Sequence, residues 1–273
     1  MESAPQATTV VVLGDCGVDV LSVVAEPYRR GALLMGANHM SIGGQAAATA
    51  AWLGKIGVSC SLLACVGDDA LGQYVKAQTA RLGVKTDLVQ VVPGGRTSIT
   101  VRSIDETGSA TSLLDPGVND ELQLTPVAAA GIASAQVMVA SLRSYLRPQT
   151  HDVAIQALAT AREADTVVVI DVAEAELITQ AKPKHIRRFL DQADIILAND
   201  EEVSALTADQ PKGWLGSLPN LIIKHGPGGA SWWSHGEPVA RRSAAAGDVL
   251  DTTGAGDAFC AGGDINEMKK FPG

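Results

Sequence analysis

The chain has 273 residues, of which 46% are apolar, 19% charged and 4% aromatic. This composition is that of a globular protein, and the length suits one large α/β domain or two small ones. The formal net charge of −9 and the lack of basic runs argue against a partner with a phosphate backbone, so we expect no nucleic acid. An acidic protein still binds nucleotides where backbone N–H groups and Mg²⁺ hold the phosphates.

The four cysteines and the start of the chain predict a cytoplasmic protein. Cys16, Cys60, Cys65 and Cys260 are scattered without metal-ligand spacing, which is typical of free thiols in a reducing compartment. Residues 1–9 lack the basic region of a signal peptide, and no long uncharged apolar run follows. We therefore expect no membrane partner.

Apolar runs alternate with helix-favouring segments from the start of the chain, which predicts a parallel α/β sheet. The expected helices near the start cover residues 45–53 and 71–82. The expected strands cover residues 10–13, 61–66, 137–141, 166–171, 195–199 and 221–224.

Between residues 93 and 116 the pattern changes to that of an exposed hairpin. Residues 97–102 alternate with period two, and the turn residues 106–108 precede a second run at 110–114. The simplest organisation is one α/β domain, residues 1–273, that carries a small β lid.

The stretch 251–257, Asp-Thr-Thr-Gly-Ala-Gly-Asp, has the chemistry of a phosphoryl-transfer site. Small residues at Gly254, Ala255 and Gly256 let a ligand approach the backbone, and a helix that begins there offers unpaired N–H groups as an anion hole. Asp257, in the first turn, can accept the proton of an attacking hydroxyl. An isolated motif of this kind is more often a capped helix after a glycine turn, so its context decides.

Further motifs occur in an order that resembles the ribokinase-like, or PfkB, family of carbohydrate kinases. The stretch 251–257 looks like the C-terminal signature of that family. The other matching segments are 43–44 with 53–57, 66–72, 82–84, 199–202 and 224–230. The resemblance covers roughly residues 10 to 260 and implies a three-layer, parallel-sheet ribokinase-like fold, with lid segments at about 16–42 and 93–116.

The resemblance implies an ATP-dependent kinase with Asp257 as general base and residues 254–256 as anion hole. It also implies Mg²⁺, positioned through water by Asn199 and Glu202, and a monovalent cation such as K⁺ near Asp251. The implied nucleotide-binding residues are Lys224, Gly226, Gly229 and Thr253. From the residues alone, Glu202 could equally be a solvated carboxylate at a helix start, and 226–229 an ordinary hairpin turn.

Substrate contacts implied by the resemblance come from the end of the first strand, the Gly-Gly turn and the lid. They are Asp15, Asp19, Gly43, Gly44 and Gln45. Asp19 matches the usual acid of the family more closely than Asp15, which could be an exposed turn residue. The hairpin 97–114 would close over a sugar or nucleoside and exclude water, or pair two subunits into a homodimer through the lid.

Three departures from the family pattern leave alternatives open. Ala48 stands where the family usually has Asn, 171–173 reads Asp-Val-Ala instead of Asp-x-Asn, and the chain after Asp257 is short. The leading hypothesis is an active sugar, sugar-acid or nucleoside kinase. The alternative is a catalytically weak metabolite-binding protein with an incomplete nucleotide pocket. A short likeness of 258–265 to the enoyl-CoA hydratase family suggests a third reading, which predicts binding of CoA esters.

Overall fold

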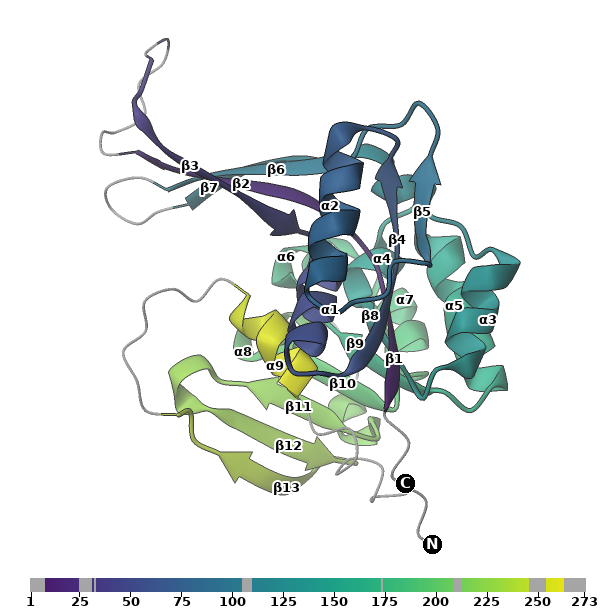
Figure 1. Ribbon diagram of the computed structural model, residues 1–273. Helices are drawn as coiled ribbons and strands as arrows, with labels where there is room; N and C mark the ends of the chain where they lie inside the picture. The colour runs from purple at the N-terminus through teal and green to yellow at the C-terminus, as the bar shows by residue number, and fades with distance from the viewer. Residues whose placement is uncertain are drawn as a thin grey trace, which may run out of the picture.

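The computed structural model describes residues 8–24, 31, 33–104, 110–172, 174–208, 213–245 and 254–262. Within these ranges the chain forms a large sheet with helices on both faces and a smaller sheet that projects from it (Figure 1). No helix in the described part is both long and apolar enough to cross a bilayer.

The large sheet is parallel except at one edge. In sheet order its strands are β13 (Glu237–Arg242), β12 (Ala230–Ser234), β11 (Leu221–Lys224), β10 (Ile195–Asn199), β9 (Val167–Asp171), β8 (Val137–Ser141), β1 (Thr9–Leu13), β4 (Ser59–Gly67) and β5 (Val89–Val92). Within this order, all neighbours from β11 through β10, β9, β8, β1 and β4 to β5 pair in parallel. Strand β12 pairs antiparallel with both β11 and β13. Each of the six strands expected from the sequence is present, with small shifts at the ends.

The strands are apolar on both faces because a helix layer covers each face. Val10 and Val12 of β1 face one hydrophobic cluster, and Val11 and Leu13 face the other, as the two-residue period of a strand requires. The first cluster includes residues of α1 (Gln45–Lys55), α2 (Ala70–Arg81) and α9 (Ala255–Gly262). The second includes residues of α3 (Pro126–Ser134), α4 (Leu142–Leu146), α5 (His151–Glu163), α6 (Ala175–Gln180), α7 (Pro183–Leu190) and α8 (Asp200–Ala208).

The short connections include three 3₁₀ turns. They are η1 (Gly117–Glu121), η2 (Trp214–Ser217) and η3 (Gly226–Gly228). Asp69 caps the N-terminus of α2, and its side chain accepts a hydrogen bond from the Gly72 amide at 2.7 Å. The predicted helices 45–53 and 71–82 correspond to α1 and α2.

The smaller sheet has the order β3-β2-β6-β7. Its strands are β2 (Gly17–Val24), β3 (Gly36–Gly43), β6 (Ser98–Ile104) and β7 (Ala110–Asp115). Strands β6 and β7 pair antiparallel, which confirms the predicted hairpin; the turn at 106–108 lies outside the described residues. Strand β2 belongs to the first expected lid segment and β6 to the second, and the two strands pair in parallel. Strand β2 also pairs antiparallel with β3. Figure 1 shows this sheet projecting from the α/β body.

Candidate active site

A cleft of about 540 Å³ opens at the carboxyl edge of the large sheet, where β9, β10 and β11 end and α9 begins. Ligands of open α/β sheets bind at this edge because the loops that follow the strands converge there. Of the residues predicted from the sequence, the following line the cleft: Gln45, Asn199, Glu202, Lys224, Gly226, Gly229, Gly254, Ala255, Gly256 and Asp257.

Asp257 lies in the first turn of α9, directly after a tight bend. Gly254 has φ 73°, a left-handed conformation that glycine adopts without strain, and its carbonyl accepts a hydrogen bond from the Ala258 amide at 2.9 Å. The carboxylate of Asp257 accepts a hydrogen bond from Thr49 Oγ1 at 3.3 Å. Burial, followed by the negative charge of Asp171, raises the pKa of Asp257 to about 6.

Lys224 lines the cleft close to the start of α9. Its Nζ lies 3.0 Å from Asp171 Oδ1, and a Cβ added to Gly256 would lie 3.7 Å from the same Nζ. Although burial alone would lower the pKa of Lys224, the charge and hydrogen bond of Asp171 raise it above its ordinary value. Lys224 therefore presents a positive charge beside the start of α9.

Asp171 is buried and held from two sides. Besides Lys224, it accepts a hydrogen bond on Oδ2 from Gln45 Nε2 at 2.7 Å. The carbonyl oxygen of the Gln45 side chain accepts a bond from Ser141 Oγ at 2.7 Å. Both ends of the Gln45 amide are thus bound within the wall of the cleft, and the chain of contacts joins β8, α1, β9 and β11.

Asn199 and Glu202 form a reciprocal cap at the start of α8. Asn199 Oδ1 accepts from the Glu202 amide, and Glu202 Oε2 accepts from the Asn199 amide, both at 2.8 Å. Glu202 is 6% exposed, so it is not the solvated helix-start carboxylate that the sequence left open. Burial raises its pKa, against the opposing effects of the Asn199 hydrogen bond and the Lys224 charge.

The loop 225–229 is a hairpin turn that also lines the cleft, so the two alternatives for it are compatible. The antiparallel pairing of β11 with β12 continues through it, and the His225 amide donates to the Gly229 carbonyl at 2.8 Å. Gly226 (φ 55°) and Gly229 (φ 88°) both adopt left-handed conformations. A side chain at Gly229 would also collide with the Arg242 carbonyl, so this turn requires glycine.

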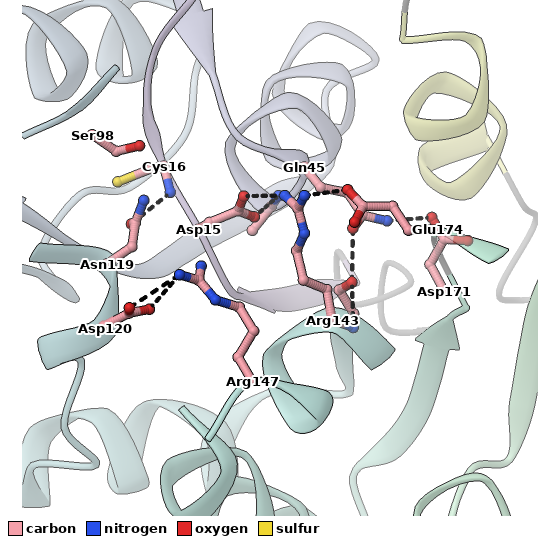
Figure 2. Close-up of polar contacts among 12 residues, drawn as sticks. Asp15, Cys16, Gln45, Ser98, Asn119, Asp120, Arg143, Arg147, Asp171 and Glu174 are labelled. Carbon is pink, nitrogen blue, oxygen red and sulfur yellow. Dashed lines mark hydrogen bonds and ion pairs between the residues drawn. The ribbon is translucent and has the colours of Figure 1, made fainter. Parts of the chain in front are cut away.

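Arg143 is a site residue that motif reading missed. It follows β8, lines the cleft, and its guanidinium lies between the carboxylates of Asp15 and Glu174 (Figure 2). The distance from Arg143 Nη1 to Asp15 Oδ2 is 3.2 Å. Asp15, with a side chain 16% exposed, is therefore a paired carboxylate and not an exposed turn residue. A polar residue at the carboxyl end of a predicted strand is the signal that could have found Arg143, and Asp171 as well.

The remaining predicted substrate residues lie outside the lining of the cleft. A side chain at Gly43 would collide with the carboxylate of Asp19, and one at Gly44 with the backbone of Asp15. Burial raises the pKa of Asp19, against a hydrogen bond from Thr100 and the charge of Arg102. Thr253 and Asp251 lie outside the described residues. The further lining residues not singled out from the sequence are Glu174 and Phe259.

Comparisons with known proteins point to one family. Residues 7–263 match the model of the family described as "pfkB family carbohydrate kinase". The chain is 29% identical over 246 residues to the ATP-dependent ribose-1-phosphate kinase of Halopiger xanaduensis. The aligned region covers 86% of this chain and 76% of the relative. It is 24% identical over 269 residues to the ribokinase of Haemophilus influenzae, which covers 93% of this chain and 83% of the relative.

Solved structures share the fold. The Arabidopsis thaliana ribokinase complexed with ribose and ATP superposes with a TM-score of 0.80 at 21% identity and covers 98% of this chain and 88% of its own. A putative ribokinase II from E. coli gives a TM-score of 0.82 at 20% identity and covers 97% of this chain and 88% of its own. The predicted three-layer α/β fold with a lid sheet is confirmed.

Proposed function

Because the chain belongs to the pfkB family of carbohydrate kinases, we propose that the cleft described above transfers the terminal phosphoryl group of ATP to a hydroxyl of a small sugar-like substrate, with Asp257 as general base. The protein is an ATP-dependent carbohydrate kinase. The observation that carries the proposal for this site is the meeting of Asp257, Lys224 and Glu202 around one cleft, although they come from α9, β11 and α8.

Asp257 has the position and the proton affinity for the base. It lines the cleft, and a pKa of about 6 leaves it mostly ionised at neutral pH while it still takes a proton readily. The backbone amides of Gly254, Ala255 and Gly256 stand at the start of α9, where they would receive the charge that develops on the transferred group.

The nucleotide would lie along the other half of the cleft. Gly226 and Gly229 bring the backbone to the surface there, Lys224 offers a positive charge, and Thr253 precedes the anion hole in sequence. The relative from Halopiger xanaduensis is named as ATP-dependent, and the Arabidopsis ribokinase is complexed with ATP. These facts support ATP as the phosphoryl donor.

Mg²⁺ would be held through water by Asn199 and Glu202. Glu202 Oε2 and Asn199 Oδ1 accept hydrogen bonds within the reciprocal cap, which fixes both side chains at the edge of the cleft. From there the Glu202 carboxylate would accept hydrogen bonds from the water of a hydrated ion. In the described ranges no group of three or more His, Cys, Asp or Glu could hold a metal ion. The proposal therefore rests on Asn199 and Glu202 alone, and Mg²⁺ is an ion that keeps much of its water when bound. When bound, the ion would neutralise phosphate charge. A K⁺ near Asp251 stays a prediction for the undescribed segment.

The substrate would lie between the cleft and the lid sheet, near Asp15, Asp19, Gln45 and the Gly43-Gly44 turn. Relatives are named for ribose 1-phosphate, ribose and fructose as substrates, and a sugar, a sugar acid or a nucleoside all fit the proposal. Ala48 replaces the amide expected there and offers no hydrogen bond to a hydroxyl.

We further propose a homodimer through the lid and a cytoplasmic location. Large apolar side chains are exposed on or beside the lid strands, namely Val23, Leu33, Met35, Met40, Leu113 and Leu114. A second copy of the lid would cover them.

The four cysteines support the proposed cytoplasmic location. They are free and buried, as expected in a reducing compartment.

ADP release with a panel of pentoses, hexoses, their phosphates, sugar acids and nucleosides tests the proposed function. Turnover with at least one of these substrates is the expected result. If ATP or a sugar binds measurably but no substrate of the panel is turned over, the result would contradict the proposed kinase activity of this site and favour the metabolite-binding alternative.

A further inference from the structure

We propose that Thr49 is the positioning residue of the phosphoryl transfer: its hydroxyl holds one oxygen of Asp257 so that the other faces the cleft. The inference rests on the proposed role of Asp257 as general base. Thr49 lies in α1, which packs beside α9 (Figure 1), and its Oγ1 lies 3.3 Å from Asp257 Oδ1. The two residues are 208 positions apart in the sequence.

The hydroxyl of Thr49 makes an unusual contact for a helical residue. Ser and Thr inside helices commonly return their hydroxyl to the carbonyl four residues earlier, as Thr160, Ser204 and Thr207 do in this chain. Thr49 instead donates to a side chain of another helix. It is 2% exposed, so its hydroxyl depends on a protein partner, and that partner is Asp257.

If the residue at position 49 had only to pack in α1, alanine would suit the position better than threonine. Its neighbours on the buried side of α1 are Ala46, Ala47, Ala50 and Ala51. Alanine has the highest helix propensity and no polar group to bury, whereas threonine loses side-chain freedom in a helix. A threonine among these alanines therefore costs stability in α1, and the bond to Asp257 compensates for it.

The contact leaves the second oxygen of Asp257 for the substrate. A Cβ added to Gly254 would lie 3.8 Å from Asp257 Oδ2, so this oxygen faces the glycine bend that lines the cleft. With Oδ1 held by Thr49, the carboxylate presents Oδ2 to a hydroxyl beside the anion hole. A general base must be positioned in this way before it can accept a proton.

The same contact opposes the groups that disfavour the charged form of Asp257. Burial, Asp171 and Asp15 raise its pKa, whereas the Thr49 hydrogen bond and Lys224 lower it. Cys260, on the same helix, is a buried thiol with a raised pKa and is therefore uncharged. Thr49 thus helps to keep the base ionised near neutral pH.

Two substitutions separate the hydroxyl from the shape of the side chain. Thr49→Val keeps the volume and removes the donor, and Thr49→Ser keeps the donor. In Thr49→Val we expect kcat at pH 6 to fall about fivefold and the acid limb of the kcat profile to move up by about one pH unit. KM for both substrates should stay within about twofold, because no binding contact is lost. Thr49→Ser should keep the parent profile.

The pKa of Asp257 can also be followed without turnover. Carbonyl NMR of protein labelled with ¹³C-aspartate reports it directly, with the Asp257 signal assigned by its loss in Asp257→Asn. We expect the signal to titrate higher in Thr49→Val and unchanged in Thr49→Ser. This readout keeps the inference separate from the proposed function, because it decides on Thr49 even where no sugar is turned over.

Thr79→Val is the matched control. Thr79 is also a buried threonine, on α2, but among the described residues its Oγ1 has no hydrogen-bond partner. This variant should leave the Asp257 titration and the kcat profile unchanged. An Asp257 pKa in Thr49→Val equal to that of the parent would overturn the inference, and so would equal shifts in the valine and serine variants.

Discussion

Lys224 and Asp171 form a buried ion pair across one intervening strand, since β10 lies between β11 and β9. The Nζ–Oδ1 distance is 3.0 Å, and the two side chains are 15% and 7% exposed. Each charge has lost most of its water, so each depends on the other for compensation. The pair also connects Lys224, on the proposed nucleotide side of the cleft, with Gln45, which binds the second oxygen of Asp171.

Removal of one member of this pair should destabilise the fold. Lys224→Met leaves the Asp171 carboxylate buried without its cation, and we expect the free energy of unfolding to fall by about 3 kcal/mol. Urea unfolding at pH 7 measures the change. Lys55→Met, at an exposed lysine over the Trp52 ring, is the control and should cost less than about 1 kcal/mol. Equal losses of unfolding free energy for the two variants would show that the buried pair stabilises the fold no more than an exposed lysine does.

The pH dependence of turnover should reflect the raised pKa of Asp257. Since the base acts in its ionised form, kcat should decline below about pH 6. Asp171→Asn removes the largest charge that raises this pKa, so the acid limb should move to lower pH. Steady-state kinetics from pH 5 to 9 measure both profiles. An acid limb that stays in place or moves upward in Asp171→Asn would disprove the electrostatic link.

The proposed base should cost the fold some stability at neutral pH. A carboxyl whose folded-state pKa is raised binds its proton more tightly in the folded than in the unfolded protein, so stability falls as the pH rises from about 4 to 6. Asp257→Asn escapes this loss. Because the group is partly exposed, we expect a gain of only about 1 kcal/mol at pH 7 and none near pH 4. Urea unfolding at both pH values checks this, and a variant less stable than the parent at pH 7 would contradict it.

Asp69 should contribute stability of the opposite pH dependence. Its carboxylate accepts hydrogen bonds from the amides of Gly72 and Thr97 and from Thr97 Oγ1, at 2.6 to 2.8 Å. Burial alone would raise its pKa, but these hydrogen bonds outweigh that effect and lower it. Its stabilising effect is therefore present above the ordinary pKa of an aspartate and is lost as the pH falls through the lowered value.

Replacement of Asp69 by alanine tests this cap. At pH 7 the loss should be about 1 to 2 kcal/mol, typical of a helix cap, and it should shrink as the pH is lowered to about 3. Thermal unfolding at several pH values measures the difference. A loss that stays constant with pH would mean that the charge of Asp69 contributes nothing.

The family and the main sheet were predictable from the sequence because their signals are local. Buried parallel strands are short runs of Val, Ile and Leu, and motifs such as 251–257 are contiguous. The family prediction is confirmed. Strands β2 and β3 were not identified individually, because β2 pairs with β6, which is distant in sequence, and β3 is exposed along most of its length. The boundaries of the lid as a unit stay a prediction.

The wall of the cleft was only partly predictable. Lys224, Glu202 and Asp257 each belong to a local motif, whereas Arg143 belongs to none and the Asp-x-Asn pattern at Asp171 is incomplete. Arg143 and Asp171 enter the cleft because parallel strands bring their carboxyl ends together. The contact of Thr49 with Asp257 depends on the packing of α1 beside α9, which no spacing in the sequence reveals. The roles of all these residues are still predictions.

The most direct test of Asp257 as the catalytic base compares phosphoryl transfer and ATP binding in Asp257→Asn and in the parent protein. With the substrate found by the ADP-release panel, we expect kcat to drop by roughly 10²-fold or more, while calorimetry gives an ATP Kd within about threefold of the parent. A variant that retains the parent kcat while binding ATP normally would show that another group accepts the proton.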